Sequence, residues 1–521
     1  MRRQQIPLKG EGRCIALALA SLTLAACTVG PNYHTPATPT PPAYQEAGAS
    51  PAVSAATPDL GAWWSQFHDP TLDSLVARAL AGNLDVATAA SKIRQAREQI
   101  VIARAPLFPQ VRGDASVNNT MLSKNAGFSQ LAGAFGGGGG GASGGGGGSG
   151  GSGGGGKGIG LPGTDFTTYT VGFDASWELD LFGQTRRGVE AARGRAEAQV
   201  WSLRDTEVSV AAEVAVDYLT LRAAQAQIAV AQKEVARQQQ LLALVGARRQ
   251  AGFATRLETS QQRTQLAAAL AQIPPLQAQA RAQIHALGVL TGQPPEALSA
   301  ELTPAAATPG PPPAVPVGLP SELLRRRPDI RQAERNLAAA TADVGVAVGA
   351  LYPQINLTGS VDLISESLRT LVSANSLQTS ATAALVQTIF DAGRNRANIR
   401  ATREARRQAW YAYQKTVLTA LQDVEDALSR YGAEQRRNAQ LHASADAAGH
   451  AFATAQARYQ SGLSDFINVL NTEAAVFTAQ QQLAQSDGQL DQDLVSLYKA
   501  LGGGWTADDN PSHAADLPDK G

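Results

Sequence analysis

Residues 169–180 read YTVGFDASWELD, and apolar and polar side chains alternate along this stretch. Alternation with a period of two is typical of a β-strand that has one apolar and one polar face. The same alternation occurs in 111–118 and 355–363, and more weakly in 381–389. The sequence therefore predicts four two-faced strands, which come in two pairs along the chain.

A long helix is predicted after each strand pair. Residues 184–248 contain no proline and only three glycines, and apolar residues recur there every seven positions, as in a coiled coil. At 1.5 Å per residue such a helix is about 100 Å long. Residues 394–461 form its counterpart. Four shorter helices are also predicted, at 71–105, 256–290, 321–350 and 465–500. The first two together match one long helix in length, and so do the last two.

The two sets of elements are copies of one another. Residues 108–111 (FPQV) recur as 352–355 (YPQI), and 247–252 (ARRQAG) recur as 457–462 (ARYQSG). The chain is therefore a tandem duplication. The first copy carries an extra, almost pure glycine tract that cannot pack. The predicted divisions are a signal peptide at 1–26, an extended segment at 27–70, a first repeat at 71–302 with a glycine-rich loop at 119–164 (its tract at 136–156), a proline-rich linker at 303–320, a second repeat at 321–505 and a tail at 506–521.

The N-terminus is typical of an exported lipoprotein. Basic residues precede an apolar stretch, 14–26, that is too short to span a membrane. Residues 24–27 (LAAC) resemble a lipobox, so we expect cleavage before Cys27 and lipid attachment to its thiol. A plain signal peptide is the alternative. No later run reaches 18 apolar residues, so a membrane crossing would have to use β-strands.

Composition and motifs exclude several function classes. The formal net charge of +0 argues against a nucleic-acid partner. The chain has only 2 cysteines, which cannot supply a four-thiolate zinc site. The six histidines are scattered without metal-ligand spacing. Residues 151–158 (GSGGGGKG) have the spacing of a phosphate-binding loop, but a further glycine stands where Ser or Thr is required. We therefore expect no enzymatic activity, no cofactor and no metal.

Four strands cannot close a barrel. Barrels of eight strands are filled by side chains, so two copies would form a plug, whereas three copies would give twelve strands around an open bore. The alternative, the edge of a soluble β-sandwich, leaves the long helices unexplained. The apolar Tyr169, Phe173 and Trp177 are expected to face lipid. The polar residues expected to face the bore are Thr170, Asp174, Ser176, Glu178, Asn356, Thr358 and Ser360.

Five motifs occur in a fixed order along nearly the whole mature chain. They are 27–33 (CTVGPNY), 63–70 (WWSQFHDP), 318–330 (GLPSELLRRRPDI), 390–394 (FDAGR) and 500–505 (ALGGGW). This set resembles the signature of TolC-like outer membrane factors, and the lipoprotein branch called NodT fits best. The resemblance implies a mixed α and β membrane protein that forms a homotrimer. Its 12-stranded transmembrane β-barrel, with four strands per chain, would continue into a long periplasmic coiled-coil α-helical barrel.

The same resemblance implies a function without bond chemistry. The trimer would be the passive exit duct of a tripartite efflux system that exports small molecules, such as drugs and toxic compounds, across the outer membrane. Its partners would be a periplasmic adaptor (a membrane fusion protein), an inner-membrane pump of the RND type and outer membrane lipid. An exit duct for type I protein secretion or metal export is an alternative. A periplasmic adaptor or structural coiled-coil lipoprotein is another, although adaptors carry one hairpin and lack duplicated strand pairs.

The resemblance also implies roles for the turns between long and short helices. A tyrosine–acid pairing that restrains the periplasmic gate corresponds to Tyr459 and Glu258. The family's rings of aspartates correspond to Asn468 and Asn471, so neutral polar rings are expected there, with Asp465 a further candidate for a charged ring. Plain helical hairpin turns are the alternative interpretation. The residues expected to contact the adaptor are Gly252, Phe253, Ala254 and Thr255 in the first turn and Gly462, Leu463, Ser464 and Asp465 in the second.

Overall fold

The computed structural model describes residues 28–49, 53–54, 60–121, 165–310, 312 and 315–505. The predicted signal peptide, Cys27, the glycine-rich loop from 122 to 164 and the tail at 506–521 lie outside these described residues. The chain falls into two compact units, which are described one at a time. Of the described residues, the first unit contains those within 28–30, 102–188 and 345–397, and the second contains those within 31–101, 189–344 and 398–505.

The first unit is built on a four-stranded antiparallel sheet in the order β2-β3-β5-β6. The strands are β2 (Gln110–Met121), β3 (Asp165–Leu179), β5 (Gln354–Ser365) and β6 (Leu377–Val386). Their alternating pattern predicts the first three closely. The last strand lies earlier than the predicted 381–389, because Val386 pairs with Gln354, where β5 begins, and later residues have no partner in that strand. Short helices accompany the sheet, namely η3 (Ala105–Leu107), α10 (Leu368–Leu371) and η4 (Ala374–Ser376).

The register of the sheet keeps polar residues together on one face. Asp174 lies opposite Ser360, and Ser176 lies opposite Thr358. On the other face Phe173 lies opposite Val361. Because side chains point to alternate faces along a strand, one polar and one apolar face result.

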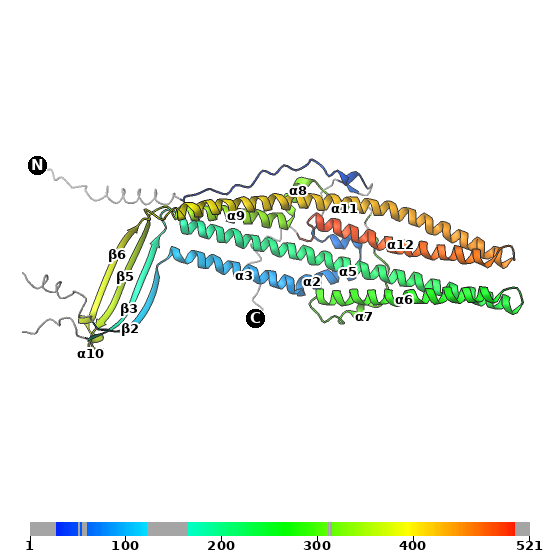
Figure 1. The fold of residues 1–521 in the computed structure, drawn as a ribbon, viewed down its shortest axis with the longest axis horizontal. Coiled ribbons are helices and arrows are strands. Elements are labelled where there is room, and N and C mark those ends of the chain that lie inside the picture. The colour runs from blue at the N-terminus through cyan, green and yellow to red at the C-terminus, as the bar shows by residue number, and fades with distance from the viewer. Residues whose placement is uncertain are drawn as a thin grey trace, which may run out of the picture. The chain divides into compact units, whose positions relative to one another are not determined.

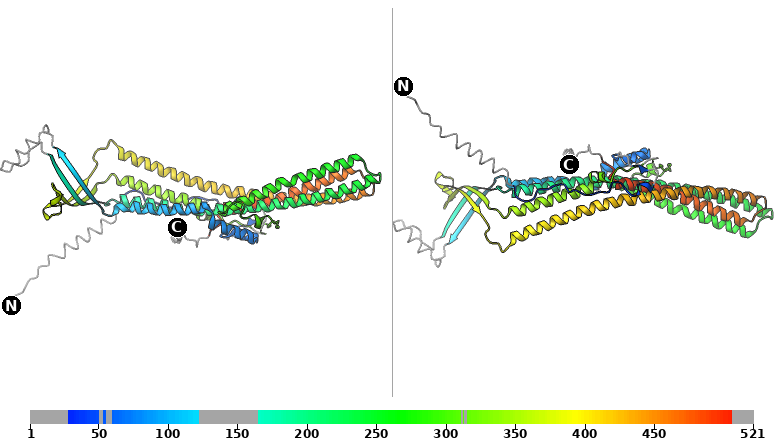
Figure 2. Two further views of the ribbon diagram at one scale, coloured as in Figure 1. Left: turned by 90° about the horizontal axis from the view of Figure 1, so that it is seen from below. Right: turned by 90° about the horizontal axis from the view of Figure 1, so that it is seen from above.

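The second unit contains most of the helical residues, and the two longest helices, α5 and α11, begin in the first unit. Its helices run alongside one another (Figures 1 and 2), joined for example by the Arg195–Asp343 ion pair between α5 and α9. The helices are α2 (Pro70–Gly82), α3 (Leu84–Arg104), α5 (Gln184–Gln250), α6 (Arg256–Leu290), α7 (Ser299–Leu302), α8 (Pro320–Arg326), α9 (Pro328–Gly349), α11 (Arg394–Gln460) and α12 (Phe466–Ala500). The two rods therefore end within two residues of the predicted positions.

Two of the predicted shorter helices are interrupted. The stretch 71–105 divides at Asn83, whose side-chain Oδ1 accepts hydrogen bonds from the backbone N–H groups of Asp85 and Val86 and so starts a new helix. The stretch 321–350 divides at Arg327, because a residue before proline is disfavoured in the helical conformation. Pro274 and Pro275, in contrast, are accommodated inside α6.

The hydrophobic core of the second unit is centred on Trp63, which is fully buried in η2 (Trp63–Phe67). Its ring stacks on Tyr498 with centroids 5.3 Å apart and meets Trp64 edge-on at 5.6 Å. Asp69 caps α2 by accepting from Thr71 N–H at 2.8 Å. The remaining short elements of this unit are η1 (Glu46–Ala49) and a parallel pair formed by β1 (Val53–Ser54) and β4 (Val315–Pro316). The motif at 63–70 thus builds the core.

Within the described residues, no helix combines the length and the hydrophobicity needed to cross a bilayer.

Candidate functional site

The two turns that join long helices to short ones lie at the same end of the second unit (Figure 1). In the first turn Gly252 N–H donates to Arg249 O at 3.1 Å, and Phe253 N–H donates to Arg248 O at 2.8 Å. This pair of bonds is a Schellman motif, which needs a left-handed residue. Gly252 supplies it with φ +82°, and Gly462 supplies it in the second turn with φ +75°. Glycine is therefore required at both turns by backbone geometry.

Each turn presents an apolar side chain to solvent directly after its glycine. Phe253 is 75% exposed and Leu463 is 71% exposed, although both are large and apolar. The start of the following helix differs between the two turns. Thr255 forms a capping box with Glu258, whereas Asp465 makes no side-chain capping bond. Ala254 and Ser464 are half-buried between these positions, so the structure gathers all eight predicted contact residues into two neighbouring turns.

The predicted gate pair, Tyr459 and Glu258, lies next to the two turns, at the end of α11 and the start of α6. Tyr459 Oη donates to Glu258 Oε2 at 3.5 Å, the long end of the range for a hydrogen bond. The tyrosine is buried, and its ring packs on Phe466 with centroids 5.2 Å apart. Burial and the charge of Glu258 raise the pKa of Tyr459, so the hydroxyl stays protonated and can donate. The structure therefore links α11 to α6 through these two residues.

Arg248 is a third member of this group that the motif comparison does not identify. Its guanidinium lies over the Tyr459 ring, with Cζ 4.4 Å from the centroid, and its Nη1 donates to Tyr459 O at 2.6 Å. The tandem repeat could have drawn attention to this residue, because an arginine stands at the same place in both copies, Arg248 in the first and Arg458 in the second. The tyrosine is thus held by a cation–π contact as well as by the acid.

Asn468 and Asn471 lie three residues apart on the exposed face of α12. Asn468 Nδ2 donates to Ser464 Oγ at 3.0 Å, which ties it to the turn. A cavity of about 910 Å³ adjoins the same turn and is lined by Asn468, Asp465, Arg458 and His450 among others. Asn468 therefore borders an open, polar space beside the exposed Leu463, whereas Asn471 does not line it.

A buried polar cluster joins α5, α6 and α12 further from the turns. Gln238 Nε2 donates to Glu234 Oε1 at 2.6 Å and to Glu473 Oε2 at 2.5 Å, and Gln262 donates to the backbone oxygen of Gln238 at 3.0 Å. All four side chains are almost fully buried. Burial, together with the hydrogen bond and charge of Glu234, raises the pKa of Glu473 far above its ordinary value. The cluster connects the two helical hairpins through groups that sequence periodicity does not single out.

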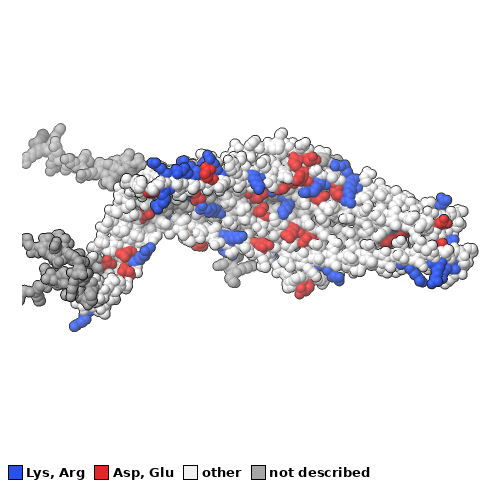
Figure 3. Space-filling view, in the orientation of Figure 1, with Lys and Arg blue, Asp and Glu red and all other residues white. Residues whose placement is uncertain are grey.

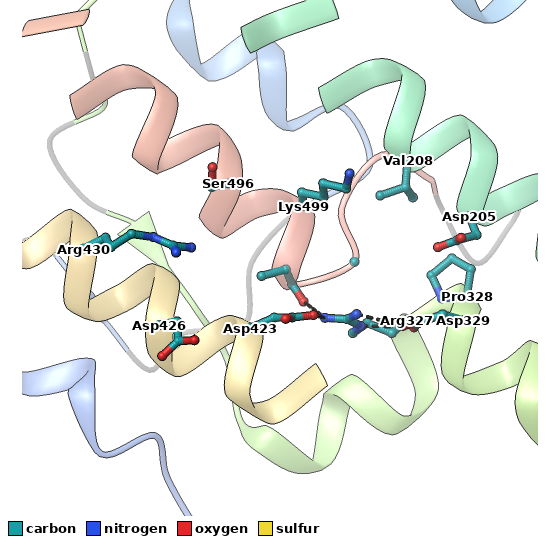
Figure 4. A pocket seen from close by; sticks show the side chains of 12 residues that line it. Asp205, Val208, Arg327, Pro328, Asp329, Asp423, Asp426, Arg430, Ser496 and Lys499 are labelled. Atoms are coloured by element: carbon teal, nitrogen blue, oxygen red, sulfur yellow. Dashed lines mark hydrogen bonds and ion pairs between the residues drawn. The ribbon is translucent and has the colours of Figure 1, made fainter. Parts of the chain in front are cut away.

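Arg327 of the motif at 318–330 has a structural role. It forms ion pairs with Asp329 at 2.7 Å and with Asp423 of α11 at 3.0 Å, and it donates to Ala500 O at 3.1 Å (Figure 4). It lines a cavity of about 340 Å³ together with Lys499 and other charged residues. Arg327 therefore fastens the start of α9 to α11 and to the end of α12.

Three carboxylates gather on the polar face of the sheet. Asp114, Asp174 and Asp362 have oxygens within 4.8 Å of one another, and Arg112 lies opposite Asp174 in the register. Asp114 and Asp174 are exposed. This arrangement is typical of a solvated polar face whose charges water can screen.

The N-terminal segment is anchored where β3 passes into α5. Val29 N–H donates to Phe182 O at 3.1 Å. Gly183 has φ +80°, and a Cβ atom there would lie 2.7 Å from Thr28 Cγ2. Thr28, the residue directly after Cys27, is therefore packed against the junction between strand and helix.

Comparisons with known proteins agree with this architecture. The family model described as "Outer membrane efflux protein" matches residues 75–293 and 319–503. The pyoverdine export outer membrane protein OpmQ of Pseudomonas aeruginosa is 32% identical over 95% of this chain and 97% of its own length. The solvent efflux pump outer membrane protein SrpC of Pseudomonas putida is 31% identical over 94% of this chain and 98% of its own length.

A solved structure shows the same fold. The structure of the outer-membrane channel OprN superposes with a TM-score of 0.81 at 33% identity, covering 92% of this chain and 100% of that one. The expected mixed α and β fold with long helices is therefore confirmed, and so is the expectation of a channel function without catalysis. A periplasmic adaptor is excluded by the same match. The chain belongs to the outer membrane efflux protein family, the channel components of efflux pump systems.

Proposed function

We propose that three copies of this chain form one passive channel, with a twelve-stranded β-barrel in the outer membrane and an α-helical barrel in the periplasm. The observation that carries this proposal is the apolar face of the sheet. Among the described large exposed apolar residues of the four strands, all but Val386 at the end of β6 have odd residue numbers and so lie on one side of the register. They are Val111, Val117, Val171, Phe173, Val361, Leu377 and Leu385. An exposed apolar sheet face of this kind is stable in lipid but not in water.

The two outer strands support the assembly of several copies. Among the described residues β2 pairs only with β3, and β6 pairs only with β5, so each strand has one unpaired edge. Unpaired backbone groups are too costly in a bilayer, and a closed ring removes them. Three copies supply twelve strands, which enclose an open bore whose lining is the polar face with Asp174 and Ser360. A polar bore of this kind suits the passive transport of solutes in water.

A lipid anchor at Cys27 is consistent with the position of its neighbour. Thr28 packs at the end of β3, where a strand crossing the membrane would leave the bilayer. An acyl chain on Cys27 would therefore enter the inner leaflet without any displacement of Thr28 from its contact with Gly183. Localisation would be the outer membrane, with lipid at Cys27 and a large periplasmic portion.

The exposed turns are the proposed contact with a periplasmic adaptor. Phe253 and Leu463 are 75% and 71% exposed among the described residues, and a partner would bury them. The adaptor would in turn connect the channel to an inner-membrane pump of the RND type. No energy source is required in this chain, because the pump drives transport.

The exported substrate is proposed to be a small molecule. The two relatives described above are named as a pyoverdine export protein and as a component of a solvent efflux pump. A metal-export system is kept as the second candidate, because the cation efflux system protein CusC of Escherichia coli is 28% identical over 94% of this chain.

The closed state is proposed to depend on the bond between Tyr459 and Glu258. We expect the double variant Tyr459→Phe/Glu258→Gln to raise single-channel conductance in planar bilayers, because α11 and α6 lose their link at the turns. The matched control is Tyr411→Phe/Glu98→Gln, which makes the same chemical changes at exposed positions of α11 and α3. Equal conductance of the double variant and the wild type would show that this pair is not the gate. A monomeric mass in detergent, or no conductance in any sample, would refute the channel assembly itself.

A further inference from the structure

The first turns of α11 carry more arginine than any neighbouring helix start. Residues 400–407 include Arg400, Arg403, Arg406 and Arg407, and basic side chains gather over this part of α11 in Figure 3. Among the described residues only Arg407 has a carboxylate partner, Glu404 at 2.8 Å. Like charges three or four residues apart on an exposed helix face repel one another weakly, and an anionic surface facing them would relieve this repulsion.

Helix geometry places these arginines on a face of their own. At about 100° per residue, Arg400, Arg403 and Arg407 lie within one stripe of α11. The buried residues Tyr413 and Val417, which pack within the protomer, lie roughly 110° and 70° around the helix from the middle of this stripe. The small exposed residues of the same turns, Ala401, Ala405 and Ala412, lie on yet another side. The arginine stripe therefore adjoins the face that packs inside the chain and lies away from the exposed alanine face.

The N-terminal segment identifies which side of the helix the stripe occupies. A cavity of about 400 Å³ is lined by Tyr33 and His34 of that segment together with Arg406, Arg407 and Trp410. Tyr33 is fixed there, because its Oη donates to Glu334 Oε1 at 3.1 Å. A segment tethered to the bilayer through Cys27 must run outside the channel, so the arginines beside it also face outward.

Chain length places the stripe close to the membrane. Tyr33 follows Cys27 by six residues, so it lies within about 20 Å of a lipid-bearing thiol. Arg400 lies about 9 Å along the axis from the first residue of α11, which follows the strand β6. Side chains of a helix lean toward its N-terminus, so these guanidinium groups lean back toward the strand end. Both distances are within reach of lipid headgroups.

We propose that Arg400, Arg403 and Arg407 form an outward-facing binding surface for anionic phospholipid headgroups of the inner leaflet of the outer membrane. Guanidinium groups bind phosphate through paired hydrogen bonds, and arginines near an anionic bilayer each strengthen its attraction by about fivefold. The surface holds the protein at a fixed depth and supplements the anchor at Cys27. This inference rests on the proposed function, because it needs the strands to be in the membrane.

The test measures which lipids remain with the purified protein. Wild type and variants are equilibrated with mixed micelles that contain phosphatidylcholine and phosphatidylglycerol, and retained lipid per trimer is counted by native mass spectrometry. Arg400→Gln/Arg403→Gln should reduce phosphatidylglycerol enrichment by about fivefold or more, and high salt should do the same to the wild type. Arg400→Lys/Arg403→Lys should keep most of the enrichment. The control Arg263→Gln/Arg281→Gln removes two exposed arginines from α6 and should change nothing.

Trimer mass and conductance are recorded in the same samples, so that two failures can be told apart. Conducting trimers with equal phosphatidylglycerol enrichment in every variant would overturn the lipid surface and leave the channel intact. Loss of the trimer in the glutamine variant would also overturn it, because the arginines would then belong to the contact between copies. A wild type that neither assembles nor conducts would refute the channel instead.

Discussion

Asp491 is the buried carboxylate for which the fold makes the clearest pH prediction. It is 1% exposed in α12, and its Oδ1 atom has no hydrogen-bond partner among the described residues. Burial, and to a smaller extent the charge of Asp487, raises the pKa of Asp491 from 3.8 to about 8. The folded protein therefore holds this side chain as a neutral acid at neutral pH, whereas the unfolded chain ionises it.

The sign and size of the effect follow from proton binding. Between pH 4 and pH 8 the folded state binds one more proton at Asp491 than the unfolded state does, so the free energy of unfolding falls as pH rises. The slope is about 1.4 kcal/mol per pH unit, which gives a loss of about 3 kcal/mol between pH 5 and pH 7. Above the folded pKa both states are ionised, and no further loss occurs.

Asp491→Asn removes this titration while it keeps the size of the side chain. We expect the variant to be more thermostable than the wild type at pH 8, with the difference in Tm shrinking toward pH 5, in thermal scans of the detergent-solubilised protein. Asp446→Asn, which changes an exposed carboxylate of α11, is the control and should leave the pH profile unchanged. Parallel Tm profiles for Asp491→Asn and the wild type would show that Asp491 is charged in the folded protein and would refute the reasoning.

Two further substitutions test the packing described above. Gly183→Ala should destabilise the protein by about 1–3 kcal/mol, because φ is +80° there and the new Cβ would meet Thr28; a Tm equal to wild type would contradict this contact. Trp63→Ala should cost about 3–5 kcal/mol, because it empties the centre of the core beside Tyr498, and trypsin should then cleave the second unit faster; unchanged proteolysis would place the core elsewhere.

Features that repeat with a regular period could be predicted from the sequence. The alternation around Phe173 predicts a strand, and the seven-residue repeat in 184–248 predicts a rod that the structure extends by only two residues. Breaks within helices are harder to predict from the sequence. The division at Asn83 depends on one side chain, which caps a new helix instead of continuing the old one. Local propensity does not distinguish these two outcomes.

Contacts between distant residues were the least predictable part of the candidate site. The meeting of Gln238 with Glu473 joins residues 235 positions apart, and neither lies in a motif. The contact of Arg248 with Tyr459 likewise depends on how two hairpins pack. Such pairs follow from tertiary packing, whereas the turns at Gly252 and Gly462 follow from a local need for a left-handed residue.

Glu258 receives hydrogen bonds from two directions, one from the backbone of Thr255 and one from the hydroxyl of Tyr459. The first keeps the carboxylate in place whether or not the second is made. If the channel opens by breaking the bond between Tyr459 and Glu258, the carboxylate keeps its orientation while the channel is open. The bond can then form again on closing without a rearrangement of the Glu258 side chain. Repeated cycles of transport would then proceed without any rebuilding of the first turn of α6.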